Sequence, residues 1–408
     1  MKVKVKSKKT FLIIFVMAII LGVLFGTFLI NQNKAVADKN VLDSQKQKLE
    51  VEKLKTTENN IDRLNEKIEE IENKDSSSAI SVVSTMNDKI SGNATYCPTF
   101  QLVWNDMTDV LLGGKKVELL DGTLEMVDNL NKKEFTKKDI SDEYYYTKYG
   151  KKLISVRDEI KNAIKERFDE ESKVLDNITW ADDSQVNPDA CDEYVFYAML
   201  KRVFNFEYPF DVLEEGTFEE YKNVKYFGIK KSSDSILNKQ VSVLFYDDVK
   251  NLAVKLSTKT GDEVVLVKTT KDVTNFNDVY DIVNKESKKY KDNEFAYDET
   301  LKIPNLNFDV RKEYSELEGK TFLNKEGKDT TIGAAIQTIE FELDNEGGKV
   351  LSEAIMTTLN GLVIEEETPR YFDFTEDFYL FVKEENKNKP YLAVKVDDIS
   401  AYQDGLEK

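Results

Sequence analysis

Histidine is absent from this chain of 408 residues, and cysteine occurs only twice. Without histidine, Ser-His-Asp triads, Cys-His pairs and zinc sites that need imidazole are excluded, and the commonest general base is lost. We therefore expect a protein that is not an enzyme, with no catalytic residues, no metal and no cofactor. Two cysteines do not make a disulfide framework. Cys97 and Cys191 form either a single bridge or two buried thiols.

Positive charge is also in short supply. The 58 Lys and Arg residues face 76 Asp and Glu residues, which leaves a formal net charge of −18. Binding to nucleic acid through phosphate contacts is disfavoured at this charge. Hydrophobic residues make up 40% of the chain and aromatic residues 11%, enough for a sizeable core. The chain is longer than one average domain, although single large domains of this size exist.

A long apolar run lies near the amino terminus, at residues 11–30, after a tail of residues 1–10 that is rich in lysine. Twenty residues rise about 30 Å as a helix, enough to span a bilayer core. The basic tail is expected to stay cytoplasmic. We interpret residues 11–30 as a transmembrane helix or signal-anchor of a single-pass cell-membrane protein whose carboxyl-terminal domain is extracellular. Alternatively, residues 35–37 (Ala-Val-Ala) fit a signal-peptide site, and the protein is secreted after cleavage near Ala37.

Residues 31–78 are highly charged, and apolar residues recur near heptad spacing within them. The pattern predicts a helical stalk or linker. As a short coiled coil the stalk would form a weak dimer, whereas as a solvated helix it is only a spacer, which we favour. Three serines, residues 76–78, mark the linker into the globular region.

Residues 79–404 have the pattern of an α+β domain. Helical patterning predicts helices over 79–90, over 153–168 and over 272–285, and the glycines at 113 and 114 fit the end of a further helix. Runs rich in β-branched and aromatic residues predict strands at 194–200, 241–246, 252–256 and 263–267. The run 194–200 suits a strand that is buried on both faces.

Several segments resemble those of the serpins, protease inhibitors that act as a baited trap. Residues 96–104 resemble the family's passage from a short strand into a buried helix, with Cys97 in place of the usual serine. Residues 206–210 resemble its Trp-x-x-Pro-Phe motif, with Phe206 replacing tryptophan, and residues 301–308 resemble its "Leu-Pro-Lys-Phe" strand. Residues 344–396 follow the order of its hinge, reactive-centre loop and final strands.

This resemblance implies a serpin-like multi-helix domain with large mixed and antiparallel β-sheets and an exposed reactive-centre loop at about 347–371. A transmembrane helix and a helical stalk would precede the domain. The composition, rich in Lys, Asn and Ile, indicates a bacterial member of the family, and the apolar run at residues 11–30 would tether it to the membrane.

Two alignments of the hinge differ by one residue. Either Gly348 is the hinge glycine and Lys349 takes the first loop position, or Gly347 is the hinge glycine and Gly348 takes that position. We choose the second, because the preceding apolar residues alternate with glutamates and this alignment keeps them on the family's buried face. The hinge then includes Glu346, Gly347, Gly348, Val350, Ser352 and Ala354.

The resemblance implies that the loop, once cut, enters a β-sheet as a new strand, so that every second side chain must enter the core. Lys349 and Glu353 fall in the other, outward set, where we expect solvent to take their charges. The inward set contains no charge, which favours insertion because a buried unpaired charge costs several kcal/mol. Its members are Gly348, Val350, Ser352, Ala354, Met356 and Thr358.

The bait residue follows from the length of the loop. Counting from the hinge places the scissile bond after Gly361, and counting back from Phe374 places it after Leu362 and before Val363. We favour Leu362, whose apolar side chain suits a chymotrypsin-, elastase- or subtilisin-like protease.

The expected function is an extracellular serpin-like inhibitor of serine (or cysteine) proteases that acts by loop cleavage and β-sheet insertion. Val350, Leu351 and Glu353 stand where inhibitory members usually carry alanines, and larger side chains should slow insertion. The alternative is therefore a non-inhibitory serpin-fold protein that serves as a binding or structural module on the cell surface.

Overall fold

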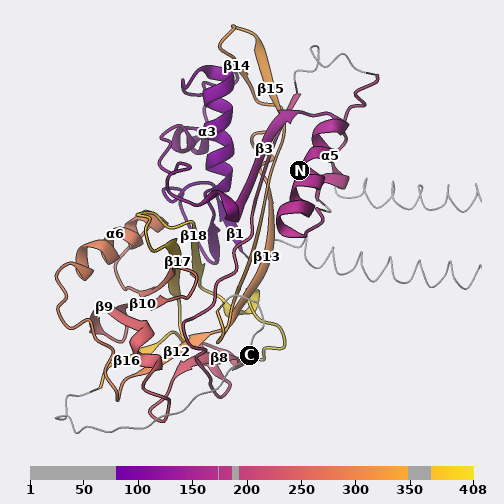
Figure 1. The fold of residues 1–408 in the computed structure, drawn as a ribbon. Coiled ribbons are helices and arrows are strands. Elements are labelled where there is room, and N and C mark those ends of the chain that lie inside the picture. Colours follow the sequence, from indigo (N-terminus) through magenta and orange to yellow (C-terminus); the bar gives the residue numbers. More distant parts are fainter. Residues whose placement is uncertain (1–79, 173, 186–192, 348–368) are drawn as a thin grey trace, which may run out of the picture. The chain divides into compact units, whose positions relative to one another are not determined.

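The computed structural model describes residues 80–172, 174–185, 193–347 and 369–408 (Figure 1). The described residues belong to one compact unit, Ser78–Lys408. The predicted basic tail, membrane helix and stalk lie outside the described residues, as do Cys191 and most of the predicted loop. Within the described ranges, no helix is both long enough and apolar enough to cross a membrane.

Three large β-sheets make up most of the described domain. The first has the strand order β1-β2-β18-β17-β11-β10-β9. Its strands are β1 (Ser81–Val83), β2 (Ala94–Tyr96), β9 (Val241–Asp248), β10 (Asn251–Ser257), β11 (Asp262–Lys268), β17 (Phe378–Glu384) and β18 (Leu392–Val396). The second has the order β16-β12-β8-β5. Its strands are β5 (Asp211–Val212), β8 (Tyr226–Ile229), β12 (Thr300–Pro304) and β16 (Tyr371–Asp373).

The third sheet has the order β13-β15-β4-β3, with β14 attached to β15. Its strands are β3 (Tyr145–Lys151), β4 (Glu193–Leu200), β13 (Leu306–Glu313), β14 (Thr321–Leu323) and β15 (Asp329–Leu343). β4 and β15 are parallel, whereas the other pairs of this sheet are antiparallel. A small hairpin of β6 (Gly216–Phe218) and β7 (Tyr221–Val224) completes the described strands. The prediction of an α+β domain with large mixed and antiparallel sheets is confirmed.

The α-helices of the described part are α3 (Thr99–Leu112), α4 (Glu125–Leu130), α5 (Ile154–Phe168) and α6 (Phe276–Ser287). α3 ends where predicted, because Gly113 adopts a left-handed φ of 62° and its N–H bonds to the carbonyl of Thr108. The predicted start of α6 at Asp272 is too early. The Asn275 side chain accepts the N–H of Asp278 and caps the helix there.

The helix predicted over 79–90 is wrong. Residues 81–83 instead form β1, which pairs in parallel with β2. The following residues are turns held by Asp88, whose carboxylate accepts the N–H groups of Ser84 and Thr85 at 2.9 Å each. Such side-chain bonds to the backbone compete with helix formation. The helical spacing of Val83 and Met86 reflects burial in the core rather than a helix.

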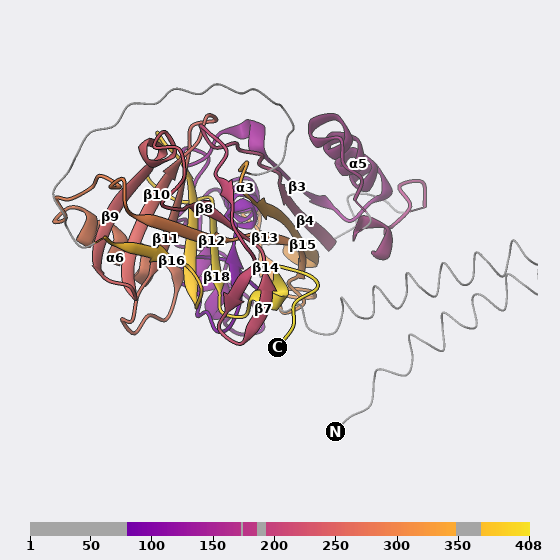
Figure 2. The same cartoon turned by 90° about the horizontal axis from the view of Figure 1, so that it is seen from below.

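The central strand β4 of the third sheet is buried on both faces. α3 covers one face, where its Trp104 packs in a cluster with Phe196 and Ala198 of β4. α5 covers the other face, where its Ile160 and Ile164 pack with Tyr197 and Met199. Figure 2 shows the two helices on opposite sides of β3, β4 and β15. The prediction that residues 194–200 form a strand buried on both faces is confirmed.

Candidate functional site: the hinge turn and its cradle

Of the predicted hinge and bait residues, Glu346 and Gly347 are described. They lie in a turn directly after the end of β15 (Figure 1). The other predicted hinge and bait residues lie outside the described residues: Gly348, Val350, Ser352, Ala354, Gly361, Leu362 and Val363. The site is therefore built here from the turn and from the groups that hold it.

The strand that leads into the turn shows the predicted alternation. Ile339, Phe341 and Leu343 are buried, whereas Glu340 is exposed and Glu342 half-buried. Strand geometry explains the pattern, since successive side chains point to opposite faces. Burial raises the pKa of the Glu340 carboxyl, and the neighbouring Asp309 carboxylate raises it further.

The turn itself is a two-residue connection closed by a pair of backbone bonds. The N–H of Asp344 donates to the carbonyl of Gly347 at 2.9 Å, and the N–H of Gly347 donates back at 3.3 Å. The Asp344 side chain accepts the N–H of Glu346 at 2.8 Å. Asn345 and Glu346 are thus the two turn residues, and Gly347 lies directly opposite Asp344. This is the geometry with which an antiparallel β-hairpin begins.

On its other side the turn contacts the segment that follows β4. Asn205 forms an antiparallel bridge with Gly347, and the N–H of Phe206 donates to the carbonyl of Glu346 at 3.0 Å. The N–H of Phe210 donates to the carbonyl of Asn345 at 2.8 Å. Gly347 therefore lies between the end of β15 and the continuation of β4.

This position requires glycine. Gly347 has a φ of 121°, which L side chains rarely adopt, and an added Cβ would lie 2.3 Å from the carbonyl oxygen of Phe204 and 2.7 Å from the Cα of Asn205. Both obstacles are backbone atoms, so a rotamer change cannot relieve the overlap.

A cluster of phenylalanines forms the floor under the turn. Phe206, in the place of the family's tryptophan, is 1% exposed, and its ring lies 4.8 Å from that of Phe210 and 6.0 Å from that of Phe227. Phe204 packs against Phe341 of β15 with ring centroids 6.2 Å apart. The motif at 206–210 thus packs at the end of the parallel strand pair.

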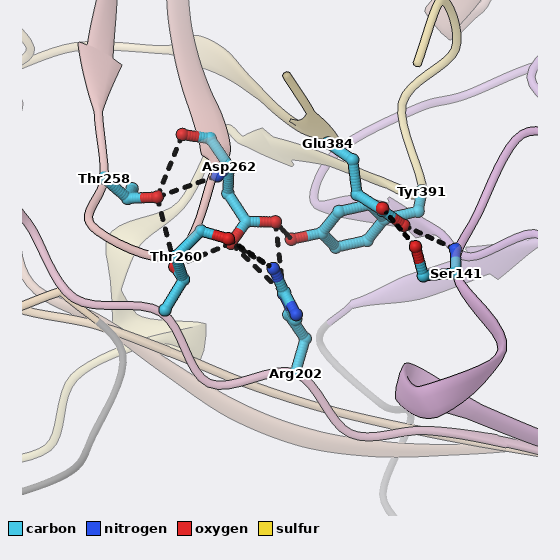
Figure 3. Close-up of polar contacts among 7 residues, drawn as sticks. All are labelled: Ser141, Arg202, Thr258, Thr260, Asp262, Glu384 and Tyr391. Carbon is cyan, nitrogen blue, oxygen red and sulfur yellow. Dashed lines mark hydrogen bonds and ion pairs between the residues drawn. The ribbon is translucent and has the colours of Figure 1, made fainter. Parts of the chain in front are cut away.

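A buried ion pair fixes the continuation of β4 to the first sheet (Figure 3). The Arg202 guanidinium donates to both oxygens of Asp262, with distances from 2.5 to 3.1 Å, and the two side chains are only 5% and 0% exposed. Tyr391 donates to the same carboxylate at 2.8 Å, as does Thr260. Arg202 also lies over the ring of Tyr144. Buried charges persist only when paired and hydrogen-bonded in this way.

The Tyr391 hydroxyl, which donates to Asp262 of the ion pair, stays protonated in these surroundings. Burial and the nearby Asp262 carboxylate raise the pKa of the Tyr391 hydroxyl far above its ordinary value. Beside Tyr391, the Glu384 carboxylate accepts both the N–H and the hydroxyl of Ser141 at 2.6 Å, as Figure 3 shows. The ion pair, together with Tyr391 and Thr260, joins the segment after β4 to the first sheet.

A second buried contact links β15 to the start of α3. The Gln337 side chain, fully buried, donates to the Cys97 carbonyl and to the Thr99 hydroxyl, both at 2.9 Å, and accepts the Tyr314 hydroxyl at 2.7 Å. Cys97 is a buried free thiol, and burial raises its pKa to about 11. No group of three or more acidic or cysteine side chains that could hold a metal occurs in the described segments.

Sequence reasoning missed the residues that hold the turn. One signal in the sequence could have identified Arg202. It follows Lys201 after a strand that is buried on both faces, and it directly precedes the apolar pair Val203-Phe204. Nothing in the sequence identifies Asp262 as its partner, because the two residues are far apart along the chain and meet only through the packing of two sheets.

No protein-family model and no curated protein matches the sequence. Among solved structures, the chain is similar to Serpin48 of the insect Tenebrio molitor, with 9% identity, a TM-score of 0.43, and coverage of 75% of this chain and 92% of that one. It is also similar to the mouse protein-Z dependent protease inhibitor, with 14% identity, a TM-score of 0.45, and coverage of 75% and 91%. A third structure is human thyroxine-binding globulin complexed with its ligand, with 9% identity, a TM-score of 0.43, and coverage of 74% and 91%. The likeness is one of fold.

Proposed function

We propose that this chain is an extracellular serpin-like inhibitor of serine or cysteine proteases that acts by loop cleavage and β-sheet insertion. The observation that carries the proposal is the Asp344–Gly347 turn, whose Gly347 forms antiparallel bridges with both Asp344 and Asn205, directly after the ends of the parallel strands β15 and β4. Chymotrypsin-, elastase- and subtilisin-like enzymes are the favoured targets, because Leu362 is the proposed bait residue, with the bond after Gly361 as the alternative.

The turn defines a register for the inserting strand. With Asp344 opposite Gly347, the next partners along β15 are Leu343 with Gly348, Phe341 with Val350, and Ile339 with Ser352. Residues directly opposite each other in an antiparallel pair point to the same face. The uncharged inward set proposed from the sequence therefore falls on the buried face of β15.

The bridge on the other flank gives the same register. With Asn205 opposite Gly347, Ser352 falls opposite Leu200 of β4. Leu200 and Ile339 are already direct partners in the closed sheet. The new strand would thus match both neighbours without either one sliding, and insertion requires only that β4 and β15 separate sideways.

One expectation from the sequence needs revision. The outward set was expected to meet solvent, but this register places Glu353 beside Met199, which is buried against α5. Insertion therefore requires α5 to move from this face, or Glu353 to find a cation there. Lys201, which lies on the same face of the chain two residues further on, is half-buried and already pairs with Glu170 at 2.5 Å.

The free energy that drives insertion of the cut loop would come from replacing the direct pairing of β4 with β15. The parallel pair β4–β15 would be replaced by a strand that is antiparallel to both neighbours, and antiparallel pairing is slightly more stable per residue. The uncut chain would persist because the sheet must open first, so its stability is kinetic.

Incubation with chymotrypsin and with subtilisin tests the proposal. We expect a covalent complex that survives denaturing electrophoresis, together with cleavage after Leu362. The cleaved chain should melt at a higher temperature than the uncut chain, since it gains a central strand. Clean cleavage with neither a complex nor a rise in melting temperature would refute the inhibitor proposal and favour the non-inhibitory binding protein.

Two observations favour the second function, that of a non-inhibitory binding protein. Val350 would have to enter between Phe341 and Arg202, both already buried, which should slow insertion. In addition, a half-open pocket of about 290 Å³ lies between Met86, Phe135 and Tyr280, with Gln101, Glu134 and Lys389 also in its lining. A binding protein would use such a cavity, whereas the trap does not require it.

A further inference from the structure

A half-open pocket of about 290 Å³ lies between α3, α6 and the connection from β17 to β18. Its lining comes from segments that are far apart along the chain. It includes Met86 from the turns between β1 and β2, Gln101 of α3, Phe135, Tyr280 of α6 and Pro390. No lining residue belongs to the hinge turn, within the part of the chain that the structure describes. The pocket is therefore a feature of the folded domain and not of the proposed trap.

Hydrogen bonds between the segments hold the walls of the pocket in place. The N–H of Asn277 donates to the carbonyl of Met86 at 3.1 Å, and its side-chain amide donates to that of Asn87 at 2.7 Å. These bonds join the start of α6 to the turns before β2. Asn105 of α3 donates to the carbonyl of Phe135 at 2.8 Å and fixes a second wall. A pocket formed in this way before a ligand arrives costs little ordering on binding.

Apolar side chains give the pocket room for aromatic rings. Met86, Phe135 and Pro390 are buried. The hydroxyl of Tyr280 donates to the carbonyl of Asn388 at 3.3 Å, so its ring rather than its hydroxyl is available to a ligand. A cavity of about 150 Å³ with an apolar lining holds benzene. At about 290 Å³, this pocket has room for two fused aromatic rings.

Two buried polar side chains of the lining have hydrogen-bonding capacity to spare. Tyr96, at the end of β2, is 3% exposed, and its hydroxyl makes no hydrogen bond to any residue that the structure describes. Gln101 is 2% exposed, and its Nε2 donates to Asn105 at 2.9 Å and to the carbonyl of Leu130 at 2.8 Å. Its Oε1 accepts no hydrogen bond from the described segments. Since buried polar groups normally have partners, these two mark the place where the polar group of a ligand would bind.

The two groups together specify the chemistry of that polar group. The Tyr96 hydroxyl can donate a hydrogen bond, whereas the Gln101 oxygen can only accept one. A ligand hydroxyl matches both, because it accepts one hydrogen bond and donates another. A methyl ether has no proton to donate, so it would leave the Gln101 oxygen without a partner.

The charges around the pocket favour a ligand that is uncharged. Burial raises the pKa of the Tyr96 hydroxyl well above its ordinary value, and the carboxylates of Glu134, Asp139 and Asp88 raise it further. Tyr96 therefore keeps its proton, and the same carboxylates would repel an anion bound beside it. Lys389, a cation of the lining, already donates to the carbonyl of Glu134 and pairs with Asp139.

We propose that this pocket binds a small, uncharged aromatic alcohol with two fused rings, whose hydroxyl bonds to Tyr96 and Gln101. The inference goes beyond the proposed function, because it requires neither the hinge turn nor the bait loop. The two proposals can therefore fail separately.

Two fluorescent probes test the class of ligand. 2-Naphthol carries a hydroxyl on two fused rings, and 2-methoxynaphthalene has a methyl group in place of the hydroxyl proton. The full chain is titrated into each probe at neutral pH, where 2-naphthol is uncharged, and the fluorescence of the probe is followed. We expect one site per chain and about tenfold weaker binding of the ether, because it leaves a buried acceptor unpaired.

A pair of tyrosine variants tests the recognition of the hydroxyl. Y96F removes a single oxygen from the lining and should weaken binding of 2-naphthol about fivefold, which corresponds to one neutral hydrogen bond. Y226F is the matched control. Tyr226 is equally buried, but its hydroxyl donates to the carbonyl of Thr217 at 2.7 Å and it does not line the pocket. It should bind 2-naphthol as the wild type does.

A pair of variants on α6 tests the location. N277F places a ring in the pocket, because Asn277 is part of the lining, and should abolish binding of 2-naphthol. N284F adds the same ring at an exposed position of the same helix and should bind like the wild type. If N277F is recovered unfolded, Y96F and the two probes decide the question.

The outcomes separate the claims. If the wild type shows no saturable binding of 2-naphthol, or if N277F and N284F both bind it as the wild type does, the site is not this pocket and the inference is overturned. If the two probes bind equally, or if Y96F binds 2-naphthol unchanged, the hydroxyl is not recognised and the ligand class is refuted. None of these measurements involves a protease. Failure of the proposed function is seen separately, in the lack of a covalent complex with chymotrypsin or subtilisin.

Discussion

At the scale of single residues, the hinge turn depends on the absence of a side chain at Gly347. Its backbone is in a region that disfavours L residues, and the nearest obstacles to a Cβ are backbone atoms of Phe204 and Asn205. The backbone of the turn therefore packs directly against the backbone of Phe204 and Asn205. A side chain here must push the turn away from the continuation of β4.

Gly347→Ala should lower the free energy of unfolding by about 2 kcal/mol, because it combines an unfavourable φ with a backbone overlap. Gly405→Ala is the matched control. Gly405 also has a positive φ, of 78°, but an added Cβ there would meet no atom within 4 Å. Urea unfolding of the two variants measures the difference, and equal losses would show that the cradle imposes no restriction beyond φ.

The absence of histidine has a counterpart at this scale. The described polar networks near the hinge are built from an arginine, carboxylates, a glutamine, hydroxyls and backbone groups, among them Arg202, Asp262 and Gln337. They contain no imidazole, the side chain whose ordinary pKa lies closest to neutrality.

At the scale of elements, the parallel pair β4–β15 and the turn after β15 carry the register that we propose for the inserted loop. In that register Val350 would lie opposite Phe341 on the buried face, and Lys349 would lie opposite Glu342 on the other face. A charge would thus be tolerated at one position and excluded at the next. Opposite charges directly across a strand pair also stabilise the pairing.

Exchanging these two residues tests the register. The double variant K349V/V350K keeps the composition of the loop and moves one positive charge from the outward to the inward face. We expect it to lose insertion, because an unpaired lysine would have to enter the core. After loop cleavage the wild type should gain stability, whereas the variant should not, as measured by melting temperature. A normal gain in the variant would show that the register is shifted by one residue, as in the alternative alignment of the hinge.

Elements whose signals are local could be predicted from the sequence. The end of α3 at Gly113, the buried strand β4, and the alternation of Ile339, Phe341 and Leu343 all follow from turn chemistry or periodicity. Features that depend on packing between distant segments could not. The covering of the outward face by α5 and the pairing of Arg202 with Asp262 are set by tertiary contacts. The false helix at 79–90 has the same origin, since pairing with β2 overrides a helical spacing.

At the scale of the whole molecule, the described domain joins the hinge turn to the three large sheets. Its core is continuous from the floor of the hinge to the strands of the first and second sheets, with Phe206, Phe227 and Leu266 in one cluster. The described domain has no helix that could cross a membrane. We propose that residues 11–30 attach the chain to a membrane.

The last prediction concerns this attachment. In cells that express the full chain, we expect the protein in the membrane fraction and resistant to an alkaline wash, because an uncharged run of twenty residues spans the bilayer core. L21K/L24K places two charges in the middle of the run, where each costs about 3 kcal/mol, and should release the protein from the membrane. L54K, which changes a residue of the predicted stalk, is the control and should stay bound. A soluble wild-type protein whose mass shows removal of residues 1–37 would instead establish the cleaved signal peptide, and the trap would then act as a secreted rather than a tethered inhibitor.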